Sequence, residues 1–196
     1  MIKKEIQEKR IRGYFIDATK TLLKGEGLKS ISVRNIADRA GYSYATLYNH
    51  FNDVKDLIFV CVNDFQVECA EFIRNETAAS PRGIKKIGAI INAYVKYFVQ
   101  YPGIFDLFFL EKISDITNKQ STVEMIYYLT DRLCSEEWTY CIDEKIVLAE
   151  EAETLKAEIR NVIAGLLLFY INRGYPENYQ EFTNLTQNQI NHILDR

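Results

Sequence analysis

Residues 31–51, ISVRNIADRAGYSYATLYNHF, decide the fold, because they read as two short helices joined by a tight turn. Ser32 is a suitable N-cap for an amphipathic helix at 33–40, since its hydroxyl can accept a hydrogen bond from a first-turn backbone N–H. Gly41 can adopt the left-handed conformation that ends this helix. Ser43 can cap the helix that follows. The stretch therefore predicts a helix-turn-helix, a motif whose second helix enters the major groove of DNA.

The second helix of the pair is expected over residues 44–51 and has one buried face. Leu47 and Phe51 lie four residues apart, so they anchor the helix to the core on the same side. The other side chains point outward and most of them are polar: Tyr44, Ala45, Thr46, Tyr48, Asn49 and His50. Such a face can contact base edges and phosphates without disturbing the packing.

The segments on both sides of this pair are also predicted to be helical. A helix is predicted at about 3–24, ended by Gly25 and Gly27. One of its faces carries apolar side chains at helical spacing, namely Ile11, Phe15, Ala18 and Leu22. After residue 53 the chain is expected to restart as a long helix near Val54.

Breaks are sparse in the rest of the chain. They occur at 80–81, 101–103, 114–121 and 174–176, and they divide the remainder into roughly six helices. One of these helices has an apolar stripe at Ile84, Ile87, Ile91, Tyr94 and Phe98. The next, over 104–110, is apolar nearly all round and is expected to be buried. With no alternating strands or hairpin dipeptides, the chain is predicted to be all-α with about nine helices.

Charge divides the chain into two parts. Residues 1–57 hold 11 Lys and Arg against 7 Asp and Glu, whereas the remainder holds 13 against 20. A basic N-terminal part suits an approach to phosphates. We therefore predict a helix-turn-helix DNA-binding domain at 1–53 and a helical ligand-binding and dimerisation domain at 54–196.

Several classes of protein are disfavoured. The charged N-terminus lacks the apolar core of a signal peptide. The longest uncharged apolar run, 162–171, is far shorter than the roughly 20 residues of a membrane span. A cytoplasmic protein without a membrane segment is expected. The four cysteines, Cys61, Cys69, Cys134 and Cys141, lack the spacing of a zinc site and suit buried helix faces.

An enzyme is also not expected. His50 and His192 are the only histidines, and neither has a neighbouring nucleophile or a metal-spaced partner in the sequence. The glycine-rich loops of nucleotide and dinucleotide sites, GxGxxG and GxxxxGK[ST], do not occur. We therefore predict neither a cofactor nor a metal site.

The segment that begins with the first helix resembles the DNA-binding region of the TetR family of bacterial transcriptional regulators. The resemblance covers residues 11–57 and combines four features in the right order: IAxxAG at 36–41, the turn serine, TLYxHF at 46–51 and KxL at 55–57. It implies a two-fold homodimer. In such a dimer, an N-terminal three-helix module reads DNA, and a larger helical domain binds an inducer and forms the dimer.

The resemblance also implies individual contacts with DNA. Residues expected mainly at phosphates are Ser32, Ser43, Thr46, Tyr48 and His50. Residues expected nearest the bases are Tyr44, Ala45 and Asn49, whereas Arg34 can reach either. Other roles stay open: Tyr48 can pack between neighbouring helices, His50 can serve a structural role at a helix end, and Arg34 can be only a solvated charge.

The sequence departs from the family pattern at two places. The family commonly has lysine at the position of Val54, and here the lysine follows at Lys55. Lys55 begins a helix whose N-terminal amides attract anions, so it can still contact the DNA backbone. Tyr42 replaces a small aliphatic residue and is expected to pack internally, with a partner for its hydroxyl.

Aromatic residues are frequent beyond residue 57, and some could line an effector pocket. Candidates for such a pocket are Phe65, Tyr94, Phe98, Phe105, Phe109, Tyr127, Trp138 and Phe169. Because an aromatic stripe at helical spacing is more often ordinary core, that alternative stays open for each of them.

The last two predicted helices carry more apolar residues than expected for helices exposed to solvent. Segment 144–171 becomes strongly apolar toward its end, and the final helix adds Phe182, Leu185, Ile190, Ile193 and Leu194. By resemblance, this pair forms a four-helix interface with its mate, and Gly165 permits close approach of backbones.

These observations favour one function and leave one alternative. The favoured protein is a repressor that binds a palindromic operator in double-stranded DNA as a homodimer and is released by a small-molecule effector. In the alternative, the DNA-binding regulator has a C-terminal domain that binds a protein partner instead of a small ligand.

Overall fold

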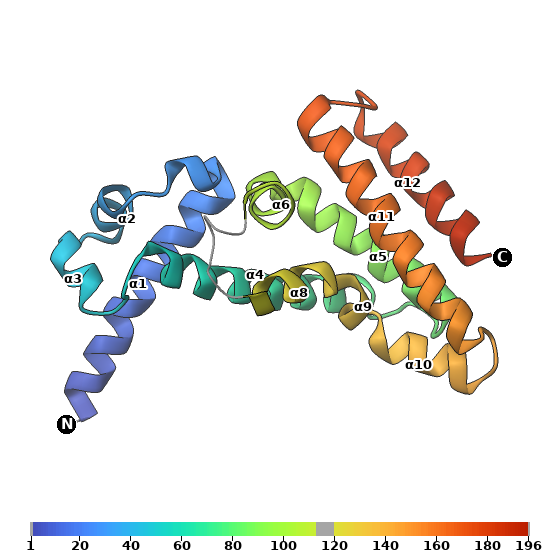
Figure 1. Ribbon diagram of the computed structural model, residues 1–196, viewed down its shortest axis with the longest axis horizontal. Coiled ribbons are helices and arrows are strands. Elements are labelled where there is room, and N and C mark those ends of the chain that lie inside the picture. Colours follow the sequence, from blue (N-terminus) through green and yellow to red (C-terminus); the bar gives the residue numbers. More distant parts are fainter. Residues whose placement is uncertain (1, 113–119, 196) are drawn as a thin grey trace. The chain divides into compact units, whose positions relative to one another are not determined.

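The computed structural model describes residues 2–112 and 120–195, and every regular element in them is a helix (Figure 1). The all-α prediction is therefore confirmed. The predicted break at 114–121 lies mostly outside the described residues. The helices in chain order are α1 (Ile2–Glu26), the 3-10 helix η1 (Leu28–Ser30), α2 (Val33–Ala40), α3 (Tyr44–Tyr48), α4 (Val54–Glu76), α5 (Ile84–Gln100), α6 (Pro102–Phe109), α8 (Gln120–Tyr127), α9 (Leu129–Leu133), α10 (Ser135–Asp143), α11 (Ala149–Arg173) and α12 (Tyr179–Leu194).

The described residues hold eleven α-helices, more than the nine expected. Much of the difference lies in α8, α9 and α10, which follow one another with no proline or glycine between them. The chain changes direction at Tyr128 (φ −95°, ψ 18°) and Cys134 (φ −98°, ψ 2°). Both residues sit near the bridge region, which ordinary side chains tolerate. The sequence contains no breaker there, so pattern analysis could not separate these helices.

Two predicted helix ends need correction. α1 continues through Gly25 to Glu26, and the chain leaves it at Gly27, which has φ 70°. α3 ends at Tyr48 instead of Phe51. After Tyr48 the backbone tightens, because the Asn49 and His50 amides donate to carbonyls three residues earlier, at 3.2 and 3.0 Å. Tightening of this kind is common where a short helix ends.

The chain divides into two compact units by packing. The first unit comprises Met1–Gln66 with Tyr101–Val123, and the second comprises Val67–Gln100 with Glu124–Arg196. The division falls inside α4 and assigns α6 to the first unit. The division into a DNA-binding part at 1–53 and a ligand-binding part at 54–196 concerns function and stays a prediction.

The core of the first unit lies between α1, α2 and α6. Phe15 on α1, Ile36 on α2 and Leu47 on α3 are fully buried. As expected for the apolar segment 104–110, the α6 side chains Ile104, Phe105, Leu107 and Phe108 are buried. Leu110, just past the helix, is 45% exposed, so the burial of this segment is not complete.

The first turn of α6 lies directly against the end of α1. A Cβ atom placed on Gly103 would be 2.2 Å from the Leu23 carbonyl oxygen and 3.2 Å from that of Lys24. No real Cβ approaches a backbone oxygen at 2.2 Å. Glycine at this position is therefore a condition for the packing of α6 on α1.

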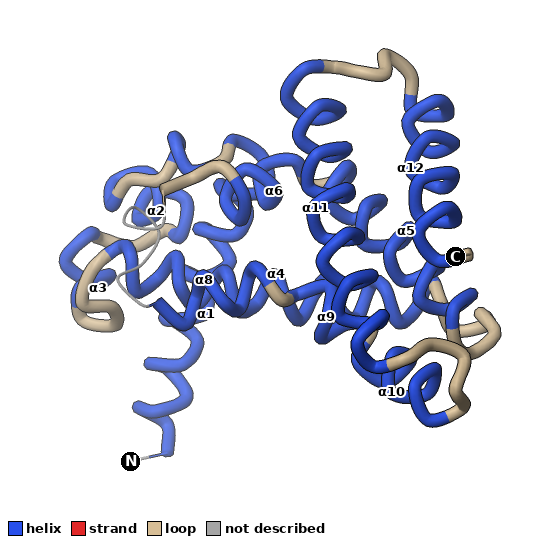
Figure 2. Tube along the Cα trace, turned by 45° about the vertical axis from the view of Figure 1, so that its right-hand side comes forward, coloured by secondary structure: helices blue, strands red, loops and turns tan. Residues whose placement is uncertain are grey.

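The second unit is built around α5, which contacts α10, α11 and α12. Its predicted apolar stripe is largely confirmed, because Ile87, Ile91 and Tyr94 are buried. Figure 2 shows α11 and α12 side by side at the end of the chain. Within this pair, the rings of Tyr170 and Phe182 stack with centroids 4.0 Å apart. None of the described helices has the length and apolar character needed to cross a membrane.

A buried carboxylate ties α10 to the start of α5. Glu137 is almost fully buried and accepts a 2.7 Å hydrogen bond from the Gly83 backbone N–H. The Arg82 Nε atom lies 3.4 Å from its other oxygen, and the Arg82 guanidinium packs on the Tyr140 ring. Glu137 thus satisfies a buried backbone donor at the entry to a core helix.

Removing this carboxylate is expected to cost stability. Glu137→Ala leaves the Gly83 N–H without its acceptor, so the free energy of unfolding should fall by about 2 kcal/mol. Urea denaturation followed by circular dichroism measures the change. The neighbouring variant Glu136→Ala removes an exposed carboxylate and should stay close to wild type. Equal stabilities of the two variants would contradict the role assigned to Glu137.

The four cysteines are all buried thiols, as the sequence predicts. Burial raises the pKa of the Cys69 thiol to about 12 and also raises the pKa of Cys134. Because the thiolate is the nucleophile, a thiol reagent at pH 8 should label none of them in the folded protein and all four in urea. Mass spectrometry counts the adducts. Rapid labelling of the folded chain would show that these helices open on the timescale of the reaction.

Candidate nucleic-acid interface

Capping hydrogen bonds define the start of α2. The Ser32 hydroxyl accepts from the Asn35 backbone N–H at 3.1 Å, as predicted. The Asn35 side chain donates to the Ser30 carbonyl at 2.8 Å, a contact that the sequence did not suggest. At the other end, Gly41 has φ 76°, the left-handed conformation expected of it. Both ends of α2 are thus fixed by local bonds.

The turn continues into α3 through a second serine cap. Ser43 accepts from the Thr46 backbone N–H at 3.2 Å, and its hydroxyl lies 2.9 Å from the Thr46 hydroxyl. A hydroxyl can accept and donate at the same time. Ser43 can therefore hold the helix start and still donate to an anion outside it.

α3 presents its outward side chains as the spacing predicts. Tyr44 is 67% exposed and Tyr48 is 52% exposed, whereas Leu47 is fully buried. Ala45 and Asn49 are also exposed, and Thr46 is partly so. Tyr48 is thus a surface residue and does not fill a gap between helices. Leu47 and Phe51 are both buried and hold this segment to the core.

Tyr42 packs against α1 but is only partly buried, so the predicted internal packing is incomplete. Its ring stacks on Tyr14 at 6.0 Å and lies 5.7 Å from Phe15, both on α1. Aromatic pairs at these distances add to the burial of apolar area. The departure from the family pattern at this position therefore attaches the turn of the motif to α1.

His50 lies beside a hollow for which the sequence gives no signal. Its ring is 6.4 Å from the Phe15 ring, and it lines a space of about 470 Å³ next to α1. The other lining residues are charged and share one face of α1, namely Glu5, Glu8, Lys9 and Arg12. Their i, i+3, i+4 and i+7 spacing was visible in the sequence. It predicts a shared face, but not which other helix that face meets.

Two predicted cationic contacts lie at the edges of the motif. The Arg34 side chain is 90% exposed and 3.8 Å from the Asp38 carboxylate one turn later, a weak pair that leaves it available. Lys55 is partly buried at the start of α4. There Asp53 accepts from the Asp56 backbone N–H at 2.8 Å, so a carboxylate already caps this helix. Two acidic residues beside Lys55 weaken the case for a phosphate at this terminus.

The aromatic residues considered for an effector pocket are divided between the two units. In the first unit, Phe65 and Phe105 are buried, and the Phe105 ring stacks on Phe109 at 5.0 Å. In the second unit, the Tyr94 and Phe98 rings meet edge to face at 4.8 Å.

The other candidates in the second unit differ from that pair in their surroundings and exposure. Trp138 is buried on α10, with the Lys156 ammonium 5.9 Å from its ring. Tyr127 and Phe169 are 49% and 56% exposed. Which of the eight residues contact a ligand stays a prediction.

Comparison with known proteins finds a family model that matches this motif. Residues 15–60 match the family model of bacterial regulatory proteins, tetR family. Among solved structures, the fatty acid degradation regulator FadR from Bacillus halodurans superposes with a TM-score of 0.72 at 15% identity, covering 93% of this chain and 94% of its own. FadR from Bacillus subtilis, in complex with stearoyl-CoA, gives 0.72 at 13% identity, covering 92% and 96%. A TetR family transcription regulator from Marinobacter aquaeolei VT8 gives 0.64 at 15% identity, covering 100% and 97%.

Proposed function

We propose that this chain, which carries the DNA-binding helix-turn-helix of the tetR family at residues 15–60 and has the fold of TetR-family transcription regulators, is a repressor that binds a palindromic operator as a homodimer. A small-molecule effector releases it from the operator. The single observation that carries the proposal is the exposed face of α3, presented on a helix that is capped at Ser43 and anchored by Leu47.

The side chains of this face have the chemistry of a groove contact. The Tyr44 and Asn49 groups are exposed, and an amide can make paired hydrogen bonds with the edge of adenine. Hydroxyl groups at Ser32, Ser43 and Tyr48 can donate to phosphates, which fix the register without reading sequence. The roles proposed for the ten DNA-binding residues follow this division between base and phosphate contacts.

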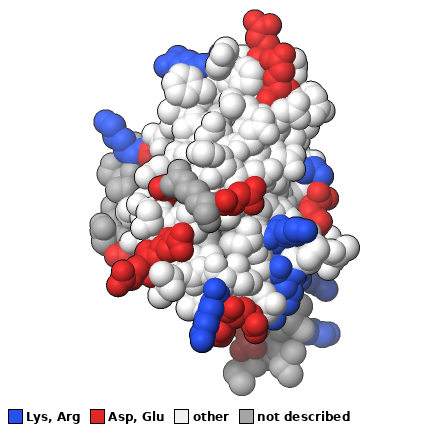
Figure 3. All heavy atoms as spheres, turned by 90° about the vertical axis from the view of Figure 1, so that its right-hand side faces the viewer, with Lys and Arg blue, Asp and Glu red and all other residues white. Residues whose placement is uncertain are grey.

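A homodimer is supported by the surface of the last two helices. Leu168 and Phe169 on α11 are 38% and 56% exposed, and a Cβ on Gly165 would meet no atom within 4 Å. Glu181 is the only Asp, Glu, Lys or Arg residue of α12. Figure 3, viewed from the side on which α12 lies in Figure 1, shows broad areas without charged side chains. An apolar, weakly charged surface is typical of an interface between identical subunits.

A small-molecule effector is supported by likeness to FadR, whose Bacillus subtilis structure holds stearoyl-CoA. An effector needs only to favour a state that differs from the DNA-bound one. A typical coupling of about 1–3 kcal/mol changes operator affinity roughly 5- to 150-fold.

Selection of random duplex DNA by the purified protein tests the proposal. The bound pool should yield an inverted repeat, with half-sites about one helical turn apart if two recognition helices enter successive major grooves. Light scattering on the same sample should give the mass of a dimer. Binding that is independent of sequence, or a monomer mass at micromolar concentration, would contradict the proposal that the protein binds a specific operator as a dimer.

The effector is tested with the selected duplex. Fluorescence anisotropy follows release of the duplex as compounds are added, with stearoyl-CoA as the first probe and a small-molecule library next. Release by a compound that leaves the protein folded supports induction by a small ligand. Retention of the duplex against all compounds would favour a protein partner for the helical domain.

A further inference from the structure

A pocket with both apolar and polar walls lies between α5 and α12 in the second unit. It is open to solvent on one side and has a volume of about 320 Å³, in the range of small-molecule sites. None of the eight aromatic residues considered above lines it. Its walls come from α5, α12 and the end of α4, namely Glu76, Thr77, Ala89, Asn92, Ala93, Val95, Lys96, Tyr179, Phe182, Thr183, Thr186 and Gln187.

Small side chains open this space between two packed helices. Ala89 and Ala93 are one turn apart on α5, and both line the pocket. Phe182 lies opposite on α12 and is held by its stack on Tyr170. The floor is therefore apolar and fixed by the core. A hollow maintained in this way does not depend on a movable loop.

One hydroxyl in the wall has no partner. Thr186 is 1% exposed, and its Oγ1 atom makes no hydrogen bond in the described part of the chain. A buried hydroxyl without a partner is costly, and most buried polar groups are hydrogen-bonded to the protein, to water or to a bound molecule. The neighbouring Thr183 hydroxyl, by contrast, donates to the Tyr179 carbonyl at 2.8 Å. Thr186 thus carries an unsatisfied hydroxyl in the wall of this pocket.

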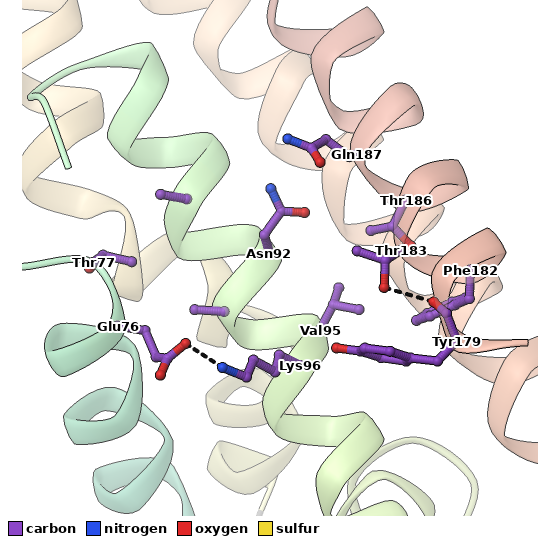
Figure 4. A pocket seen from close by; sticks show the side chains of 12 residues that line it. Glu76, Thr77, Asn92, Val95, Lys96, Tyr179, Phe182, Thr183, Thr186 and Gln187 are labelled. Carbon is purple, nitrogen blue, oxygen red and sulfur yellow. Dashed lines mark hydrogen bonds and ion pairs between the residues drawn. The ribbon is translucent and has the colours of Figure 1, made fainter. Parts of the chain in front are cut away.

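Two amides add further capacity for hydrogen bonds. Asn92 on α5 and Gln187 on α12 line the pocket, and Figure 4 shows both side chains in the space between these helices. Each amide offers two donors and one acceptor oxygen. Together with Thr186, they present donors and acceptors within a small volume.

The charges at the rim cancel. The Lys96 Nζ atom lies 2.5 Å from a Glu76 carboxylate oxygen, and this hydrogen bond raises the pKa of Lys96. The two groups therefore remain a pair at neutral pH. Figure 4 also shows the Tyr179 ring reaching from α12 toward Lys96. A pocket with amides, hydroxyls, an aromatic edge and no net charge does not select an anion or a cation.

We infer that this pocket binds a small neutral polyhydroxylated molecule of about monosaccharide size. Each hydroxyl of such a ligand can both donate and accept, which matches the amides and Thr186. Its C–H faces can lie on the alanines and the tyrosine ring, as apolar lining usually accompanies the polar groups of a ligand site. The inference does not depend on DNA binding.

Ligand-observed saturation-transfer NMR tests the inference, with glucose, ribose and myo-inositol as probes up to about 10 mM, near the weak limit of specific binding. At least one probe should show saturable binding to the wild-type chain. Thr186→Val keeps the shape and removes the hydroxyl, and Asn92→Ala removes one amide. Each should weaken binding by at least about 10-fold, because a ligand hydroxyl loses its partner.

A matched control separates binding from stability. Thr19→Val makes the same change at a buried threonine of the first unit, whose hydroxyl donates to the Phe15 carbonyl at 2.8 Å. It should leave probe binding unchanged. In the absence of ligand, Thr186→Val should raise the Tm by roughly 2–6 °C, because it removes an unsatisfied hydroxyl. Absence of binding by all three probes, or equal binding by wild type, Thr186→Val and Asn92→Ala, overturns the inference.

Discussion

Gly103→Ala is expected to lower the free energy of unfolding by about 2–3 kcal/mol, as overpacking of a rigid contact does. The added methyl group would lie 2.2 Å from the Leu23 carbonyl oxygen, so α6 must move away from α1. The obstacle is backbone, which cannot rotate away as a flexible side chain can. In an ordinary helix the same substitution is favourable, because alanine has the higher helix propensity. Urea denaturation monitored by far-ultraviolet circular dichroism measures the loss.

The matched control lies in the helix that Gly103 touches. Gly13 is inside α1, and a Cβ there meets no atom within 4 Å. Gly13→Ala should therefore raise stability by about 0.5–1 kcal/mol. If the free energy of unfolding falls for Gly103→Ala and rises for Gly13→Ala, the loss is due to the contact and not to helix propensity. A Gly103→Ala protein as stable as wild type would show that α6 can shift on α1 at little cost.

The second large effect concerns the operator. Tyr44→Ala and Asn49→Ala should each reduce the affinity for the selected inverted repeat by at least about 30-fold, because a base contact contributes roughly 1–3 kcal/mol and a dimer carries two copies. Binding to DNA of unrelated sequence should change far less, since phosphates supply that affinity. Fluorescence anisotropy at fixed salt concentration gives both constants.

The control for the operator experiment is an exposed asparagine outside the motif. Asn75 lies near the end of α4 in the second unit, and Asn75→Ala should bind the operator like wild type. Circular dichroism confirms that the α3 variants keep their fold, as expected for exposed positions. If Asn49→Ala weakened specific and unspecific binding equally, Asn49 would contact phosphate and not a base.

The helix-turn-helix could be predicted because its signals are local. Ser32, Gly41 and Ser43 act within three or four residues of themselves, through caps and a left-handed turn that any chain with this sequence can form. The burial of Leu47 and the exposure of Tyr44 follow from helical spacing alone. The boundaries of α2 were therefore predicted correctly.

The features that escaped prediction depend on distant residues. Gly103 looks like an ordinary turn glycine beside Pro102, and only the fold places it on the Leu23 carbonyl. The charged face of α1 beside His50 has clear spacing but no sequence signal for its neighbour. The same limit applies to the α5 and α12 pocket, whose two walls are more than eighty residues apart in the chain.

The position of Trp138 allows unfolding of the second unit to be followed separately by fluorescence. It is the only tryptophan of the chain, and it is buried on α10 in the second unit. Its emission reports the environment of that unit alone, whereas the many tyrosines report on both. Fluorescence excited at the red edge therefore follows melting of the second unit without any added label. Comparison with circular dichroism would then show whether damage at Gly103, in the first unit, spreads through the whole molecule or stays where it begins.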